Sequence, residues 1–383
     1  MRILATLCVL CFSSCLRATE PEPVYKTKYR VINVHRHSAV PTEDGVRAEL
    51  EVLDRVGVAQ VVILDASFPG GTLAKWLKLK EKFPERLIVF AKLDFRKVKE
   101  PNFFADIVRE IEQAAKNGAQ GVKVWKDLGM YVRDGGDKLL KADDPRLDPF
   151  WAKCGELKLP VLIHVADPKE YWYPLTYNSF HYGLRNEKDQ HYNNPEMPKW
   201  EELIRQRDSI LKKHPKTNFI GAHMGSLSFD LKQLGETFDK YPNFYADCAA
   251  RQRILGRLNP PAMRDFYTKY ADRVLFGTDN MVLYKERKPG SSANISIYPM
   301  DDPDWISVDT SDKDAVRRWQ ERAARVYGEY LQYFETDRLD LADPNRSAGA
   351  WLRIPGIKLP PEVLEKLYYK NAEKLIPGVG RPR

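Results

Sequence analysis

The chain has 383 residues, of which 43% are hydrophobic and 30% are charged, and its formal net charge is +8. This composition is typical of a globular protein with a large core and excludes a disordered or low-complexity chain. Basic residues alternate with acidic ones, as in KLKEKFPER, and form no dense patch with aromatic residues, so nothing in the sequence indicates a nucleic-acid-binding protein.

Residues 1–18 have the pattern of a signal peptide, with one arginine, the apolar run ILATLCVLCF and then small and polar residues. The run is too short to span a membrane, so we predict cleavage after Ala18 and a mature domain over residues 25–383. Alternatively, the segment FSSC resembles a bacterial lipid-attachment site, which would anchor the protein through Cys15. Either interpretation predicts an exported protein, periplasmic or secreted, without a transmembrane span.

Short apolar and β-branched runs then alternate with helical patterns, one of which covers residues 103–118. This alternation predicts a parallel sheet, and eight such units predict a (β/α)₈ TIM barrel in the α/β class. The alternative, an open doubly wound sheet, requires a glycine-rich phosphate loop where this chain has HRHSAVPTEDG. The eight predicted strands are residues 29–35, 59–67, 86–94, 120–126, 159–165, 217–223, 243–249 and 272–279.

Two connections are much longer than turns: residues 166–200 after the fifth strand and residues 280–312 after the eighth, both rich in Tyr and Trp. Loops that follow barrel strands lie at the catalytic mouth, so we expect these two to cover it rather than to pack at the periphery. Their aromatic residues favour a cyclic or aromatic ligand. Residues 359–378 predict an amphipathic helix that closes the domain.

Titratable side chains stand at the ends of four predicted strands. His35 and His37 end the first strand and point to the same face, because side chains two residues apart do so in a strand. His164, His223 and Asp279 end the fifth, sixth and eighth strands. A barrel gathers these strand ends into one ring, where so many polar groups would be costly to bury without a cation. The pattern therefore predicts a metal site.

The sequence resembles the amidohydrolase superfamily, in particular the amidohydrolase-related group that also contains metal-dependent decarboxylases. The resemblance implies that His35, His37, His164 and Asp279 bind one divalent ion, with zinc as the expected metal. It also implies that His223 and Asp279 are catalytic, His223 beside the reacting water and Asp279 as the acceptor of its proton. From about residue 31 to 377, the matching segments are VHRHS, GVKVW, DDPRLDPFWAKCGELKLPVLIHVADP, KHPKTNFIGAHMGS, RVLFGTDN and EVLEKLYYKNAEKL.

The fourth predicted strand, GVKVWK, offers Lys123 and Lys126, with Trp125 at its end. In some branches of the superfamily a lysine on this strand is carbamylated and bridges two metals. A carbamate on Lys123 would bring a second ion, held by His164 and His223. We favour a single ion, with Lys123 either paired with a carboxylate inside the barrel or, like Trp125, bound to substrate.

Other polar residues have more than one interpretation. Arg251, after the seventh strand, is a candidate to bind a substrate carboxylate through its guanidinium, and the alternative is a surface salt bridge. His181 and His191, in the connection 166–200, either reach the pocket or lie exposed. His214 and Cys248 are expected to be structural.

Together these residues predict a metal-dependent hydrolase that cleaves an amide, lactone or ester bond of a small molecule. The first alternative is a non-oxidative decarboxylase of an aromatic or unsaturated carboxylic acid, which would need an anion partner such as Arg251 near the metal. The second is a barrel that binds a small molecule without catalysis, which the complete set of ligands argues against. A monomer and a homo-oligomer are both compatible with the sequence.

Overall fold

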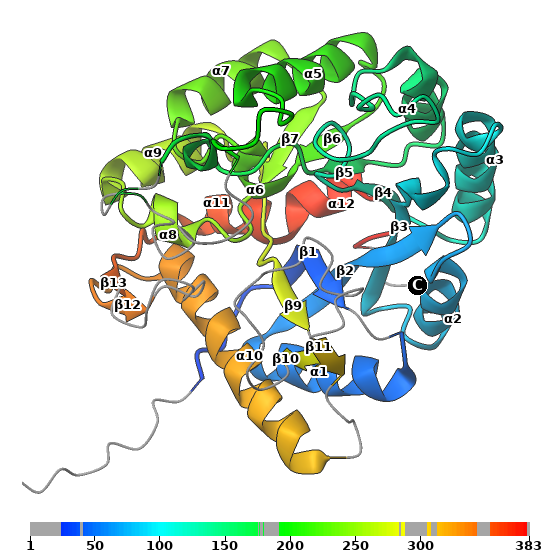
Figure 1. Ribbon diagram of the computed structural model, residues 1–383. Helices are drawn as coiled ribbons and strands as arrows, with labels where there is room; N and C mark the ends of the chain where they lie inside the picture. The colour runs from blue at the N-terminus through cyan, green and yellow to red at the C-terminus, as the bar shows by residue number, and fades with distance from the viewer. Residues whose placement is uncertain are drawn as a thin grey trace, which may run out of the picture.

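The structure, a computed structural model, describes residues 24–38, 41–174, 176, 179, 191–282, 285–287, 305–307, 312–342 and 353–380. Eight parallel strands pair in sequence order and alternate with helices, so the predicted (β/α)₈ barrel is confirmed (Figure 1). The strands are β1 (Val31–Ser38), β2 (Val58–Phe68), β3 (Leu87–Leu93), β4 (Gly121–Val124), β5 (Val161–Ile163), β6 (Phe219–Gly221), β7 (Phe244–Asp247) and β8 (Val274–Leu275).

Backbone hydrogen bonds join the two ends of this sheet and nearly close the barrel. The amide of Val34 in β1 donates to the carbonyl of Phe276 after β8 at 2.9 Å, and the amide of Asp279 donates to the carbonyl of His35 at 2.9 Å. Strand β9 (Asn280–Val282) continues the contact by pairing parallel with β1. This closure brings the end of β8 beside the end of β1.

Helices surround the sheet because their apolar faces must be buried against it. In α1 (Glu43–Val56), Val46, Val52 and Leu53 are buried, and the helix begins with the Thr42 hydroxyl accepting from the Gly45 amide. The outer layer also contains α2 (Leu73–Lys82), α3 (Phe103–Lys116), α4 (Asp148–Glu156), α5 (Trp200–Lys213), α7 (Leu231–Lys240), α9 (Pro260–Lys269) and α10 (Lys313–Glu335). The short segments α6 (Ala222–Gly225) and α8 (Gln252–Leu255) follow β6 and β7. The short 3₁₀ turns are η1 (Phe95–Lys97), η2 (Pro145–Leu147) and η3 (Lys169–Trp172).

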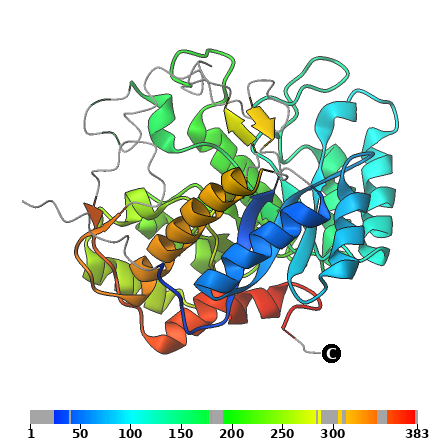
Figure 2. The same ribbon diagram turned by 90° about the horizontal axis from the view of Figure 1, so that it is seen from below.

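The C-terminal helix closes the bottom of the barrel, as predicted. It runs through α11 (Pro361–Glu365), the π-helical turn η5 (Lys366–Lys370) and α12 (Asn371–Leu375). Ala372 and Leu375 pack into the inner cluster with inward-facing strand residues such as Ile32 and Leu162. Figure 2 shows this helix along the edge of the molecule opposite the hairpin of β10 (Lys285–Arg287) and β11 (Trp305–Ser307).

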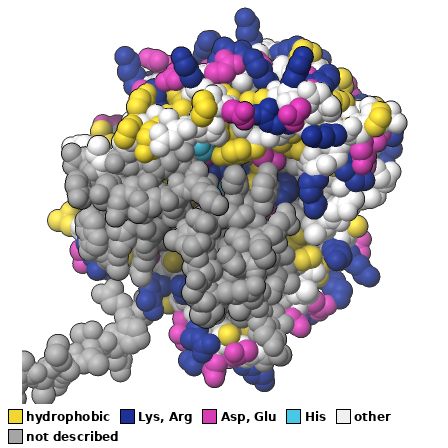
Figure 3. All heavy atoms as spheres, in the orientation of Figure 1, with side chains coloured by type: hydrophobic (Ala, Val, Ile, Leu, Met, Phe, Trp, Pro, Cys, Tyr) yellow, Lys and Arg dark blue, Asp and Glu magenta, His cyan; other side chains and the backbone are white. Residues whose placement is uncertain are grey.

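Much of the two long connections lies outside the described residues, so their predicted place over the mouth stays a prediction. The same holds for the signal peptide, residues 1–18, and for Cys15 and His181. A second small hairpin pairs β12 (Leu341–Ala342) with β13 (Arg353–Ile354). No helix in the described part of the chain has the length and apolar character that crossing a membrane requires. Basic and acidic side chains are interspersed over the described surface of the face in Figure 3.

Candidate metal centre

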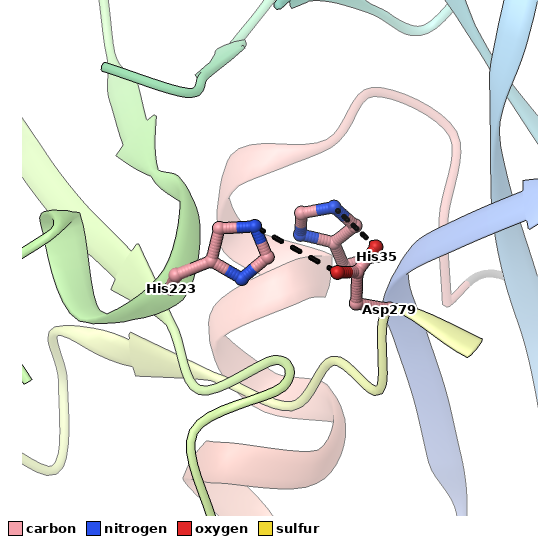
Figure 4. Close-up of side chains that lie close together, drawn as sticks. All are labelled: His35, His223 and Asp279. Carbon is pink, nitrogen blue, oxygen red and sulfur yellow. Dashed lines mark ion pairs between the residues drawn. The ribbon is translucent and has the colours of Figure 1, made fainter. Parts of the chain in front are cut away.

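Three side chains from distant parts of the sequence meet at the carboxyl ends of the strands. His35, His223 and Asp279 each offer one potential ligand atom, and these atoms lie within 4.8 Å of one another. Nε2 of His35 is 3.4 Å from Oδ1 of Asp279, and Nε2 of His223 is 3.8 Å from its Oδ2. Figure 4 shows both rings directed toward the carboxylate of Asp279.

The other two predicted ligands flank this group. Nε2 of His37 lies 3.4 Å from Oδ1 of Asp279. The ring of His164 lies against that of His223, with 4.5 Å between ring centroids. The structure therefore brings all five predicted residues to one mouth, with His35, His223 and Asp279 closest together. Which of them bind a metal stays a prediction.

Carboxylates hold the two histidines of β1 in a defined orientation. Nδ1 of His35 is 2.8 Å from Oδ2 of Asp247 at the end of β7, and Nδ1 of His37 is 3.0 Å from Oδ1 of Asp65 in β2. A carboxylate can only accept, so each Nδ1 carries the proton and donates. When such a ring is neutral, its lone pair is on Nε2, which faces Asp279, and this is the form that binds a metal.

His223 is oriented by an unusual backbone turn. Four successive residues after β6, from His223 to Ser226, have φ between 59° and 62°, in the left-handed region. Two hydrogen bonds hold this turn. The His223 amide donates to Asp247 Oδ1 at 2.9 Å, and the Ser226 hydroxyl donates to the carbonyl of Val165. Nδ1 of His223 donates to the carbonyl of Ala249 at 2.9 Å, so its Nε2 also carries the lone pair.

The buried histidines are neutral near pH 7. Burial lowers the pKa of His35, His164 and His223 well below the ordinary value, because desolvation disfavours the imidazolium. Nearby positive charges add to this effect, from Lys123 on His35 and from Arg251 on His223. Neutral imidazole is the form in which histidine binds a metal.

The donor set fits a divalent ion. Nε2 of His35 and Nε2 of His164 are buried and have no hydrogen-bond partner in the described part of the structure. Buried polar atoms almost always have a partner, so two such nitrogens in one cluster are an anomaly that a cation would remove. Imidazole nitrogens with one carboxylate are ligands that zinc accepts readily.

Strands β3 and β4 carry lysines at the mouth, Lys92 in β3 and Lys123 in β4. The side chain of Lys123 is buried, and its Nζ has no hydrogen-bond partner among the described residues, so the expected pairing with a carboxylate is not observed. Burial lowers its pKa to about 8. Trp125 packs its indole edge-on against His37, with 5.2 Å between ring centroids, and Nζ of Lys92 lies 4.8 Å from the centre of the indole.

His191 is neither in the metal group nor exposed. It is buried at the rim, where its Nε2 lies 2.9 Å from Oδ2 of Asp167, whose Oδ1 accepts from Nζ of Lys126 at 2.5 Å. Burial alone would raise the pKa of Asp167, but Lys126 and His191 outweigh it and hold the pKa well below its usual range. The ring of Trp172 covers His191 with 4.5 Å between centroids. This network fixes one end of the long connection to the barrel.

The remaining candidates are placed as follows. Arg251 is only 8% exposed, and within the described residues it donates to the carbonyl of Ala250 at 2.9 Å and forms no ion pair. It therefore does not form the alternative surface salt bridge there, and burial lowers its pKa. His214 is 3.0 Å from Asp148, a structural contact, and burial raises the pKa of the Cys248 thiol to about 12.

Asp65 and Asp247 were missed by the sequence interpretation. The available signal was a single carboxylate in an otherwise apolar strand segment, in VVILDAS and in NFYADCA. A charged residue is rarely buried without a partner, so each of these aspartates should have been expected to meet a polar group at the mouth.

The chain belongs to the amidohydrolase family, an enzyme superfamily, because the family model described as Amidohydrolase matches residues 28–378. No curated protein matches the sequence. Among solved structures, IDCase of Metarhizium anisopliae in its apo form is 12% identical and has a TM-score of 0.46, with 91% of this chain and 97% of that chain covered.

Two bacterial structures show a similar likeness to this chain. The 5-carboxyvanillate decarboxylase of Novosphingobium aromaticivorans, with bound manganese, is 14% identical with a TM-score of 0.44, covering 92% of this chain and 99% of that chain. An amidohydrolase of Burkholderia multivorans, with bound zinc, is 10% identical with a TM-score of 0.44, covering 91% and 99%.

Proposed function

We propose that this protein is a metal-dependent hydrolase that uses one divalent ion, with zinc expected, to cleave an amide, lactone or ester bond of a small molecule. The observation that carries the proposal is the convergence of His35, His223 and Asp279, whose potential ligand atoms lie within 4.8 Å of one another. Membership of the amidohydrolase family supports the same conclusion.

In this proposal His35, His37, His164 and Asp279 hold the ion. A bound divalent ion would lower the pKa of water and polarise the scissile carbonyl. The ligands are suited to this because burial keeps His35 and His164 neutral, so they add no positive charge, while Asp279 supplies one negative charge.

His223 and Asp279 are the proposed groups that move protons. Because Nδ1 of His223 donates to the carbonyl of Ala249, its Nε2 is an acceptor and lies 3.8 Å from Oδ2 of Asp279. A water between them can donate one hydrogen bond to each, which orients its lone pair for attack on a carbonyl carbon. Asp279 then accepts the proton and returns it to the leaving group.

The substrate contacts are proposed to come from Trp125, Lys123 and Arg251. Trp125 is half-buried at the mouth and offers a flat face to a cyclic or aromatic compound. Arg251 is buried beside the site, where a guanidinium suits a carboxylate. A buried arginine here also favours the second candidate function, non-oxidative decarboxylation of an aromatic or unsaturated acid, which requires a bound carboxylate near the metal.

The test is elemental analysis of the purified protein together with a panel of amides, lactones, esters and hydroxybenzoates. We expect about one equivalent of zinc or a similar ion, hydrolysis of at least one neutral or acidic member, and loss of activity on chelation that the metal restores. Release of CO₂ without hydrolysis would establish the decarboxylase instead. Tight binding of panel members without turnover would indicate the non-catalytic barrel.

We also propose that the protein is exported, with cleavage after Ala18 or lipid attachment at Cys15. The apolar run and the small residues that follow it support this proposal. The intact mass of the mature protein from a bacterial host distinguishes the two routes. A full-length chain with its first residues intact would contradict both.

A further inference from the structure

We propose that Asp247 is a positioning residue that sets both the metal-binding form of His35 and the backbone of His223. The part concerning metal affinity rests on the proposed function. Asp247 ends β7, is fully buried, and is not one of the predicted ligands. It lies behind the metal group, and both of its oxygens are engaged.

The first oxygen controls the tautomer of His35. Oδ2 of Asp247 is 2.8 Å from Nδ1 of His35 and can only accept, so the proton stays on Nδ1. The lone pair is therefore on Nε2, the buried atom that lacks a hydrogen-bond partner in the described structure and lies 3.4 Å from Asp279 Oδ1. If Nδ1 became an acceptor, the proton would move to Nε2 and the lone pair would point away from the site.

The second oxygen controls the turn that carries His223. Oδ1 of Asp247 accepts from the amide of His223 at 2.9 Å and from the amide of Ala249 at 3.0 Å. The carbonyl of Ala249 in turn accepts from Nδ1 of His223 at 2.9 Å. One carboxylate thus links the ends of β1, β6 and β7, so the proposed ligand and the proposed base share a single support.

Asp65 provides a matched comparison at the same mouth. Its Oδ1 is 3.0 Å from Nδ1 of His37, so it orients one proposed ligand in the same way. For Asp247, the other oxygen also accepts from two backbone amides, those of His223 and Ala249. Asp167 serves as the negative control, because it is a buried aspartate whose hydrogen bonds within the described part of the chain go to His191, at 2.9 Å, and to Lys126 rather than to a predicted ligand.

The decisive variant is Asp247→Asn, which keeps the shape of the side chain. If its oxygen still accepts from the two amides, its NH₂ group faces Nδ1 of His35 and can only donate, which forces the proton of His35 to Nε2. If the amide flips, its NH₂ group faces two N–H donors instead. In either orientation of the Asn side chain, either Nδ1 of His35 or the two backbone amides lose their acceptor.

We expect Asp247→Asn to lower zinc affinity 10- to 100-fold, the usual cost of losing a partner that orients a metal-ligating histidine. Asp65→Asn should lower it by a similar factor, and Asp167→Asn should leave it unchanged. Affinity is measured by competition with a chromogenic chelator. Wild-type affinity in Asp247→Asn, or an equal loss in Asp167→Asn, would overturn the proposal.

A second readout needs neither metal nor activity. Nitrogen-15 NMR of histidine-labelled, metal-free protein reports which ring nitrogen carries the proton, and a His35→Gln variant assigns the signal. We expect the proton on Nδ1 in the wild type and on Nε2 in Asp247→Asn. A wild-type His35 protonated on Nε2 refutes the proposal even if the variant does not fold. If the wild type binds no metal, the proposed function fails, while this measurement still decides the role of Asp247.

Discussion

The mouth of the barrel has two contrasting sides. On the histidine side, formed by His35, His223, Asp247 and Asp279, both Nδ1 atoms have fixed acceptors and the free lone pairs converge. The lysine side is formed by Lys92, Lys123 and Lys126, which are buried or half-buried. Lys92 lies over the indole ring of Trp125, and Lys126 donates to Asp167. The ammonium group of Lys123 has no hydrogen-bond partner among the described residues. On both sides burial disfavours the charged form of the side chain. It keeps the imidazoles neutral and lowers the pKa of Lys123 to about 8.

This difference separates two tasks. We propose that the neutral nitrogens around one carboxylate bind a cation, whereas the lysines and the aromatic surface opposite them bind an organic anion.

The largest effect is expected from Asp279→Ala, which removes the carboxylate that lies within 4 Å of Nε2 of His35, His37 and His223. We expect loss of the metal and a fall in turnover of roughly 10⁴-fold or more, the scale at which residues acting as a unit fail together. Elemental analysis and kcat on the best panel substrate measure it. If the variant retained both the metal and the turnover, the histidine side would have no role in catalysis.

Acid should destabilise the metal-free protein through the buried histidines at the mouth. The folded-state pKa values of His35, His164 and His223 are lowered, so below about pH 6.5 the unfolded chain binds protons that the native state does not. Stability therefore falls as pH falls, by up to about 4 kcal/mol per pH unit for three such groups. Urea unfolding at pH 6.5 and 5.5 tests this, and His164→Gln should reduce the slope. Equal stability at both pH values would show that the rings are protonated in the native state.

The lysine side should show the same direction of dependence in a higher pH range. The pKa of Lys123 is about 8 in the folded protein, below its ordinary value, so the native state releases a proton that the unfolded chain keeps. Stability due to this group is lowest below pH 8 and rises as pH increases toward the unfolded pKa. Lys123→Met should therefore stabilise the metal-free protein at pH 7, by on the order of 3 kcal/mol. A variant less stable than wild type at pH 7 would mean that Lys123 has a partner in solution.

The smallest effect is expected from Arg251→Met. Loss of a hydrogen bond to a charged group costs about 1.5–3 kcal/mol, so KM should rise roughly 10- to 100-fold for substrates that carry a carboxylate. For neutral substrates of the same size KM should stay near the wild-type value. Steady-state kinetics on a matched acid and amide pair measures the difference. An equal rise for both members of the pair would assign Arg251 a structural role.

Much of this arrangement could be predicted from the sequence because it depends on periodicity and topology. All eight strands lie where the apolar runs predicted them, and α3 covers Phe103–Lys116 within the predicted 103–118. The convergence of His35 with Asp279, far apart in sequence, follows from barrel closure alone. These features need no knowledge of side-chain packing.

Other features depend on packing and register, which the sequence does not display. Strand β6 ends at Gly221, before His223, because the chain enters a left-handed turn; an added Cβ at Gly221 or Gly225 would lie 2.6 or 2.8 Å from the ring of Phe244. The link from Asp247 to His35 crosses the barrel interior between β7 and β1, so no spacing in the sequence reveals it.

The left-handed turn after β6 restricts which residues can replace His223. Asn and Asp adopt positive φ more readily than other residues with a side chain, whereas β-branched residues resist it. Replacing His223 by Asn should therefore keep the local chain path and remove only the imidazole, while Val at the same place would distort the path as well. An engineer who wishes to install a carboxylate here should choose Asp over Glu, even though Glu has the longer reach.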